Sequence, residues 1–94
     1  MRIDKFLKVS RIIKRRTVAK EACDKGAVKV NGKTVKSSVD VKVGDEISVT
    51  LGEKIMKYRI KDIREHVLKN DAEELYEFIG QDRNLEFFEE TRDF

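Results

Sequence analysis

The apolar residues of this chain change their spacing at Gly26, and that change limits the folds open to the sequence. Before it, Ile3, Phe6 and Leu7 follow the i, i+3, i+4 spacing of one helical face. After it, Val28 and Val30 alternate with a lysine, as in a strand with one buried face. Helices followed by strands within 94 residues predict a single α+β domain, with two N-terminal helices packed on a small sheet.

The two predicted helices are short. The first runs from about Asp4 to Val9, and the second begins at Thr17 as its N-cap and continues to Lys25. Gly26 then supplies the left-handed residue that ends it. A buried stripe is expected on the second helix, formed by Val18, Ala19, Ala22 and Cys23.

The strands are marked by turn residues. Asn31-Gly32 is a strong signal for a two-residue hairpin turn. A strand is expected over 46–51, with Ile47, Val49 and Leu51 on one face, and a further strand with alternating residues over 54–61. The sheet should hold three to five short strands and be mainly antiparallel.

The last third of the chain differs in composition. Asn70 and Glu73 have the spacing of a capping box, and Leu75, Phe78 and Ile79 form a helical stripe, so we expect a short C-terminal helix that ends at Gly80. Residues 81–94 show no period and are interpreted as a mobile tail. We therefore divide the chain into a domain over residues 1–61 and an acidic extension over 62–94.

Charge is distributed unevenly between the two ends. Residues 1–36 carry a net charge of +9, whereas residues 62–94 carry −7. A basic face on rigid helices is typical of a surface that binds nucleic acid. The candidate RNA-binding residues are Arg2, Lys5, Lys8, Arg11, Lys14, Arg15, Arg16, Thr17, Lys20, Lys25, Asn31 and Lys33.

These residue types suit the phosphates and 2′-hydroxyls of structured RNA. An arginine can clamp a phosphate through two nitrogens, while a lysine acts as a point charge. The start of the helix at Thr17 adds backbone N–H groups beside Arg15 and Arg16, so the tightest contact is expected there. Asn31 and Lys33 at the hairpin tip could add a contact to backbone or sugar.

The sequence lacks the residues that metal binding, catalysis or nucleotide binding would require. With one cysteine and one histidine, the sequence offers neither a metal site nor a catalytic triad, and the phosphate-binding GxxxxGK[ST] loop is absent. Cys23 is interpreted as a small buried filler and His66 as a solvated side chain. We expect a binding protein without a cofactor, not an enzyme. No apolar run approaches the ~20 residues of a membrane span, which favours a soluble cytoplasmic protein.

The stretch MRIDKFLKVSRIIKRRTVAKEACDKGAVKVNGKTVK, followed by VKVGDEISV, resembles an S4 RNA-binding domain with its alpha-L motif, over roughly residues 1–51. The opening RIDKFLKVSRIIKRRTVAKEACDKG is also similar to the RqcP family of bacterial ribosome-associated quality control and to the small ribosome-associated heat-shock S4 proteins. The resemblance implies binding to 23S rRNA of the 50S subunit and to P-site tRNA. It also implies support for C-terminal tailing of stalled chains by an RqcH-type factor.

Alternatives remain open at this point. The heat-shock S4 proteins imply a role in rescue or recycling of 50S subunits, which needs the same basic face. A helix-turn-helix DNA-binding regulator, with Lys20 and Lys25 on its reading helix, is less favoured because that helix lacks Arg, Asn and Gln. A targeting subunit for an RNA-modifying enzyme is a further hypothesis. We expect a monomer.

Overall fold

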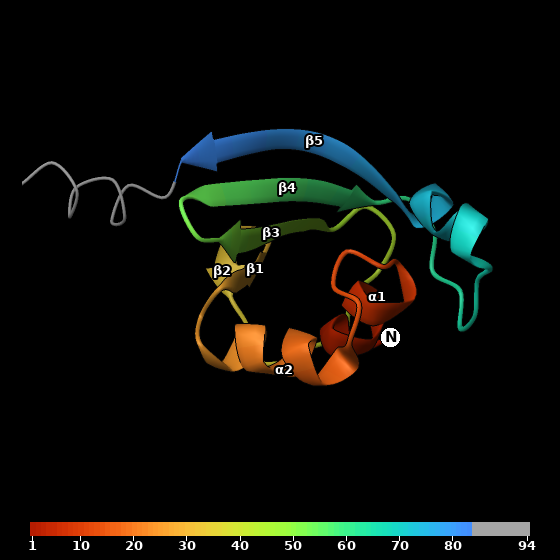
Figure 1. Ribbon diagram of the computed structural model, residues 1–94, viewed down its shortest axis with the longest axis horizontal. Coiled ribbons are helices and arrows are strands. Elements are labelled where there is room, and N and C mark those ends of the chain that lie inside the picture. The colour runs from red at the N-terminus through yellow and green to blue at the C-terminus, as the bar shows by residue number, and fades with distance from the viewer. Residues whose placement is uncertain (84–94) are drawn as a thin grey trace, which may run out of the picture.

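The computed structural model describes residues 1–83, so most of the predicted tail lies outside the described residues. The helices α1 (Ile3–Val9) and α2 (Arg16–Asp24) precede the strands β1 (Val28–Val30), β2 (Lys33–Thr34), β3 (Glu46–Leu51) and β4 (Lys54–Ile60). A 3-10 helix, η1 (Lys69–Leu75), then leads into β5 (Tyr76–Arg83). Both α-helices lie on one side of the sheet, which confirms the predicted α+β architecture (Figure 1).

The sheet has five strands in the order β2-β1-β3-β4-β5, and every neighbouring pair is antiparallel. This agrees with the expected three to five strands. The β1–β2 turn has positive φ at both central residues, 52° at Asn31 and 83° at Gly32. Two positive φ angles define the type I′ turn that the Asn-Gly pair predicts.

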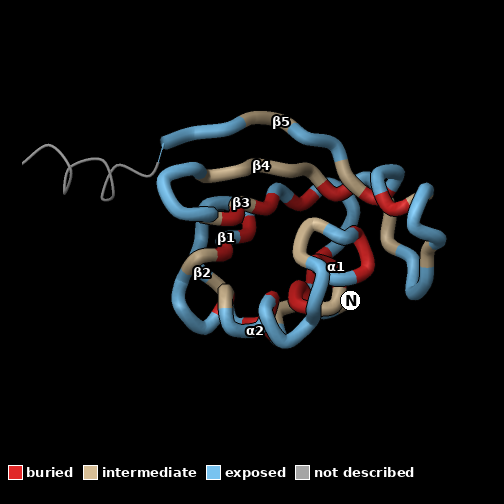
Figure 2. Tube along the Cα trace, in the orientation of Figure 1, coloured by how far each residue is buried: buried red, intermediate tan, exposed pale blue. Residues whose placement is uncertain are grey.

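The core lies between α1 and the sheet. Ile3, Phe6 and Leu7 are fully buried, as are Ile47 and Val49 of β3. Buried residues concentrate on α1 and along β1 and β3 (Figure 2). Each large side chain buried in this way stabilises the fold by about 1.5–3 kcal/mol, so α1 is held rigidly against the sheet.

The start of α2 differs from the prediction. Arg15 is the N-cap, with extended dihedral angles (φ −119°, ψ 133°), and no side chain caps the helix. Thr17 therefore lies inside the first turn, where its own backbone is helical and its hydroxyl cannot cap. The end of α2 agrees with the prediction: Gly26 has φ 77°, and the Ala27 N–H donates to the Ala22 carbonyl at 2.9 Å.

Two residues expected in the core are exposed. Val18 is 46% exposed because the buried face of α2 is narrow and is formed by Ala19 and Cys23, with Ala22 half-buried. Leu51 is 54% exposed at the end of β3. Neither residue belongs to the buried cluster that joins α1 to the sheet.

The C-terminal helix is shorter than predicted. η1 ends at Leu75, and Phe78 and Ile79 lie in β5, which pairs with β4 with one shift in register at Ile79. No side chain caps η1, so the capping box at Asn70 does not form. The open edge of β4 offers a continuous row of backbone partners, and this pairing overrides the weak helical pattern of residues 76–80. No helix within residues 1–83 is long and apolar enough to span a membrane.

Candidate nucleic-acid interface

The predicted RNA-binding side chains lie on α1, on the turn that follows it, on α2 and on the β1–β2 hairpin. Lys5 is half-buried, and the other predicted residues are exposed. Seven of the cations form no ion pair within residues 1–83: Lys8, Arg11, Lys14, Arg15, Lys20, Lys25 and Lys33. Their charges are therefore available to an anionic partner.

Arg2 and Arg16 are held together by the carboxylate of Asp4, and we call these three residues the Asp4 clamp. The Arg2 Nε lies 3.3 Å from Asp4 Oδ1, and the Arg16 Nε lies 3.5 Å from Asp4 Oδ2. The side chain of Asp4 is only 3% exposed, whereas those of Arg2 and Arg16 are each 46% exposed. One buried acid thus orients two half-exposed guanidinium groups from separate helices.

Backbone contacts fix the Arg2 and Asp4 side of the clamp. Arg2 is the N-cap of α1 and forms an isolated antiparallel bridge with Asp40, next to an Ile3 N–H to Val39 carbonyl bond of 2.8 Å. Asp4 Oδ1 also accepts the Lys5 N–H at 2.8 Å. The sequence predicted both arginines but indicated Asp4 only as the start of the first helix. Its position as the sole acid before residue 21 was the available signal.

Lys5 is neutralised within the chain. Its ammonium group pairs with Glu65, in the segment 61–68 that joins β4 to η1. The hydrogen bond from Lys5 and its charge together lower the pKa of Glu65. Of the predicted basic residues, Lys5 is therefore bound to a local acid, unlike the seven unpaired cations.

The side chain of Asn31 is also engaged within the fold. Its Nδ2 donates to Asp45 Oδ1 at 3.1 Å, and its Oδ1 accepts the Glu46 N–H at 3.0 Å. These bonds tie the β1–β2 hairpin to the turn before β3. Asn31 thus fixes the position of the hairpin tip, next to exposed Lys33.

Hollows of different sizes indent the described surface. An open groove of about 600 Å³ is lined by residues that include Arg2, Cys23 and Lys36. Burial is the main factor that raises the pKa of the Cys23 thiol, with a smaller contribution from Asp4, so the thiol stays protonated at neutral pH. No group of His, Cys, Asp and Glu within residues 1–83 could hold a metal ion.

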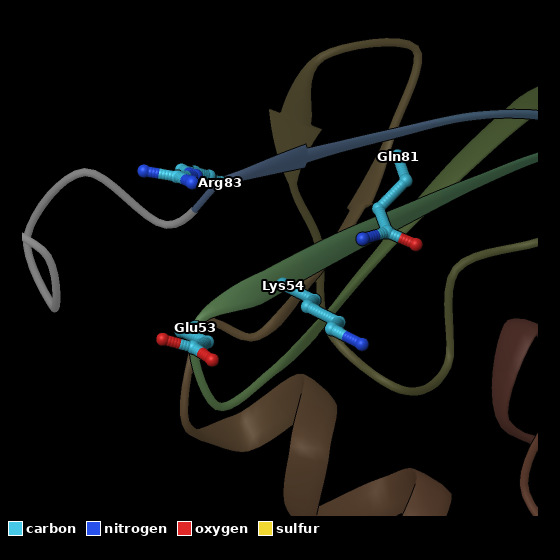
Figure 3. A pocket seen from close by; sticks show the side chains of 4 residues that line it. All are labelled: Glu53, Lys54, Gln81 and Arg83. Atoms are coloured by element: carbon cyan, nitrogen blue, oxygen red, sulfur yellow. The ribbon is translucent and has the colours of Figure 1, made fainter.

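The second hollow is small, about 100 Å³, and lies beside the end of α1. The third, about 300 Å³, lies at the β3–β4 turn and is lined by Glu53, Lys54, Gln81 and Arg83 (Figure 3). The residues that line the third hollow carry both signs of charge. The basic surface therefore centres on the helices and not on this end of the sheet.

Comparison with known proteins places this chain in a family. The model of the S4 domain family matches residues 1–47. A protein of Streptococcus pneumoniae named RQC P-site tRNA stabilizing factor is 51% identical over 83 residues, which cover 88% of this chain and 94% of the relative. The chain belongs to the family of RQC P-site tRNA stabilizing factors. A factor of this name from Listeria monocytogenes is 49% identical over 86 residues, covering 92% of this chain and 94% of the relative.

The fold of this member of the RQC P-site tRNA stabilizing factor family also matches a solved structure. The trimeric structure of Vibrio cholerae Heat Shock Protein 15 superimposes with a TM-score of 0.78 at 26% identity, covering 99% of this chain and 91% of that one. The predicted S4 fold and the resemblance to both small S4 families are confirmed. The S4 model ends at residue 47, whereas the match to the S. pneumoniae factor spans 83 residues, so family similarity extends beyond the S4 domain. The division at residue 61 stays a prediction.

Proposed function

We propose that this protein binds the 50S ribosomal subunit through 23S rRNA and stabilises P-site tRNA during ribosome-associated quality control. The observation that carries the proposal is the Asp4 clamp, which presents two oriented arginines beside unpaired cations on one helical surface. The names of relatives with 43–51% identity over most of the chain support the tRNA assignment.

Oriented guanidinium groups match the geometry of RNA phosphates, and unpaired lysines add affinity that depends on salt. A surface that contacts rRNA and tRNA together gains avidity, because the second contact forms within the complex. The protein then acts in the cytoplasm as a monomeric binder, without catalysis, and holds the tRNA while an RqcH-type factor extends the stalled chain. Arg2, Lys5, Lys8, Arg11, Lys14, Arg15, Arg16, Thr17, Lys20, Lys25, Asn31 and Lys33 remain the proposed contact residues.

The test is co-sedimentation with 50S subunits that carry or lack peptidyl-tRNA, at two salt concentrations. Wild-type protein should bind both particles and bind more tightly where tRNA is present. Arg16→Ala should lose most of this binding. Arg59→Ala is the matched control, because Arg59 is also half-exposed (44%) and paired with acids, but lies on β4.

Equal binding of wild-type protein to 30S and 50S particles would contradict the proposal, as would equal effects of the two substitutions. Loss of a single arginine on β4 changes the net charge by the same amount as loss of Arg16. A difference between the two variants therefore reports on position and not on total charge.

A role in 50S rescue, as in the heat-shock S4 proteins, is the second candidate. It is favoured by the similarity to Heat Shock Protein 15 over 99% of this chain. The two roles separate in a reconstituted system. Quality control predicts that tail extension by an RqcH-type factor depends on this protein, whereas rescue predicts that the protein alone changes the state of the tRNA.

A further inference from the structure

We infer that His66 and the end of α1 form a phosphate-binding site for RNA, to which the chain beyond the S4 domain contributes. The site is the hollow of about 100 Å³ beside α1, which we call the α1 hollow. Its lining includes Lys8, Arg11, Lys14, Glu65 and His66. This inference rests on the proposed function and adds a contact to it.

The cations of the α1 hollow come from a rigid part of the fold. Lys8 lies in the last turn of α1, and its carbonyl accepts the Arg11 N–H at 3.1 Å. Arg11 has φ 63°, in the left-handed region that glycine would occupy at lower cost. Strained residues of this kind concentrate at functional sites. The backbone therefore holds an arginine where the fold alone would favour glycine.

Residues 65–67, which also line the α1 hollow, are attached to α1. Glu65 pairs with Lys5 of α1, and Val67 packs against the core cluster. Arg64 braces the segment from the other side through Asp62, at 2.7 Å, and Glu74, at 3.2 Å. These contacts place the exposed His66 beside α1, and its ring forms no hydrogen bond within residues 1–83.

The charge and size of the α1 hollow suit a phosphate group. Lys8, Arg11 and Lys14 form no ion pairs within residues 1–83, whereas the charge of Glu65 is taken up by Lys5. The hollow is about 100 Å³, and no Phe, Tyr or Trp is among the side chains of residues 1–83 that line it. A stacked base would need a larger, aromatic surface. The ligand is therefore the RNA backbone, and free inorganic phosphate shares its chemistry.

The test varies the charge at residue 66 in the full-length chain. We expect affinity for 50S subunits carrying tRNA to rise in the order His66→Glu, His66→Gln, His66→Lys. His66→Glu should weaken binding about tenfold, and the slope of log K against log salt should fall by about one for the lost phosphate contact. Asn70→Glu is the matched control, because it places the same charge on an exposed residue of η1 outside the α1 hollow.

A second measurement identifies the ligand. His66 is the only histidine of the chain, so its ring gives a single set of NMR signals. These should shift and saturate when an rRNA fragment is added, and inorganic phosphate at equal ionic strength should shift them in the same direction at much higher concentration. A larger response to inorganic phosphate than to RNA would overturn the assignment to the RNA backbone.

Failure of this inference is distinguishable from failure of the proposed function. If wild-type protein does not select 50S subunits, the proposed function is wrong. If it does select them, and the residue 66 variants bind alike or no differently from Asn70→Glu, the α1 hollow does not bind phosphate. Melting temperatures should stay close to that of wild type, because both residues are exposed.

Discussion

Replacement of Asp4 by alanine should weaken RNA binding, although it removes a negative charge from a surface that binds a polyanion. Asp4 holds Arg2 and Arg16 in place through contacts of 3.3 and 3.5 Å. Without it, both side chains must be ordered when RNA binds, at about 0.5–1.5 kcal/mol each. The total is about 1–3 kcal/mol, or a loss of affinity of about 5- to 150-fold.

Charge alone predicts the opposite change in affinity, because removal of an acid should make RNA binding tighter. Two unit charges 4 Å apart in water interact by about 1 kcal/mol, so removal of an exposed acid near a phosphate should tighten binding by up to about that amount. Glu21→Ala tests this term separately, because Glu21 is an exposed acid on α2 that forms no ion pair within residues 1–83. That variant should bind RNA slightly more tightly than wild type, and the gain should disappear at high salt.

The assay is the affinity for 50S subunits carrying peptidyl-tRNA, measured for Asp4→Ala, Asp4→Asn and Glu21→Ala at low and high salt. Asp4→Asn should be intermediate, because its amide oxygen can still accept one bond. Loss of Asp4 also removes hydrogen bonds to charged groups, each of which contributes about 1.5–3 kcal/mol and less when half-exposed. Melting curves must therefore show that each variant is folded. Tighter binding by folded Asp4→Ala at all salt concentrations would refute the positioning role.

Three further results are expected. Arg11→Gly should weaken RNA binding yet keep or slightly raise the melting temperature, because glycine relieves the left-handed strain at φ 63°; Arg11→Ala should weaken binding without that gain. Asn31→Ala should lower the free energy of unfolding by about 1–3 kcal/mol in denaturant titrations, because the Asp45 carboxylate and the Glu46 N–H lose a partner. In an alkaline absorbance titration, Tyr58 and Tyr76 should ionise above the usual pH 10, since burial raises both pKa values. Because the pKa of each tyrosine is raised in the folded state, each contributes to the free energy of unfolding. This contribution is fully present below pH 10 and is lost as the pH rises through the raised pKa. Ionisation of both at their ordinary pKa would show that β4 and β5 do not bury them.

Local patterns predicted the helices and turns because the interactions that form them are themselves local. Asn31-Gly32 requires only two residues with positive φ, and α1 requires only one apolar face. The start of α2 was misplaced by two residues, since a threonine can cap a helix only where the backbone enters it. β5 was missed because its partner is β4, and a free strand edge elsewhere in the chain leaves no trace in the sequence of residues 76–83.

Contacts between residues that are distant in the sequence also limited the prediction of the charged surface. Composition located the cations of the helices, but the Asp4 clamp depends on the angle between α1 and α2, and the pairing of Lys5 with Glu65 joins residues 60 positions apart. Sequence could indicate which charges are present. It could not show which of them the fold neutralises.

The placement of the acids explains why the opposite charges of the two ends do not cancel. Arg59 pairs with Glu46 and Glu77, and Lys57 pairs with Asp82, so β3, β4 and β5 balance their own charges. In the segment 61–68, Arg64 pairs with Asp62 and Glu74. Among the acids of residues 62–83, Glu65 alone is paired with a helix cation, Lys5.

The described acids of the C-terminal third therefore act mainly as local partners and do not compete for RNA. A net charge of only +3 underestimates the attraction of the helical surface for a polyanion. Screening acts on exposed charges separated by more than about 8–10 Å at physiological salt, so the acids on the sheet should contribute little at the helices. It follows that the salt dependence of RNA binding should respond to substitutions of the unpaired cations on the helices and on the turn between them. It should hardly respond to neutralisation of Glu77 or Asp82. If neutralisation of those two acids changed the salt slope as much as loss of Lys14 or Arg15, the separation of charge described here would not govern binding.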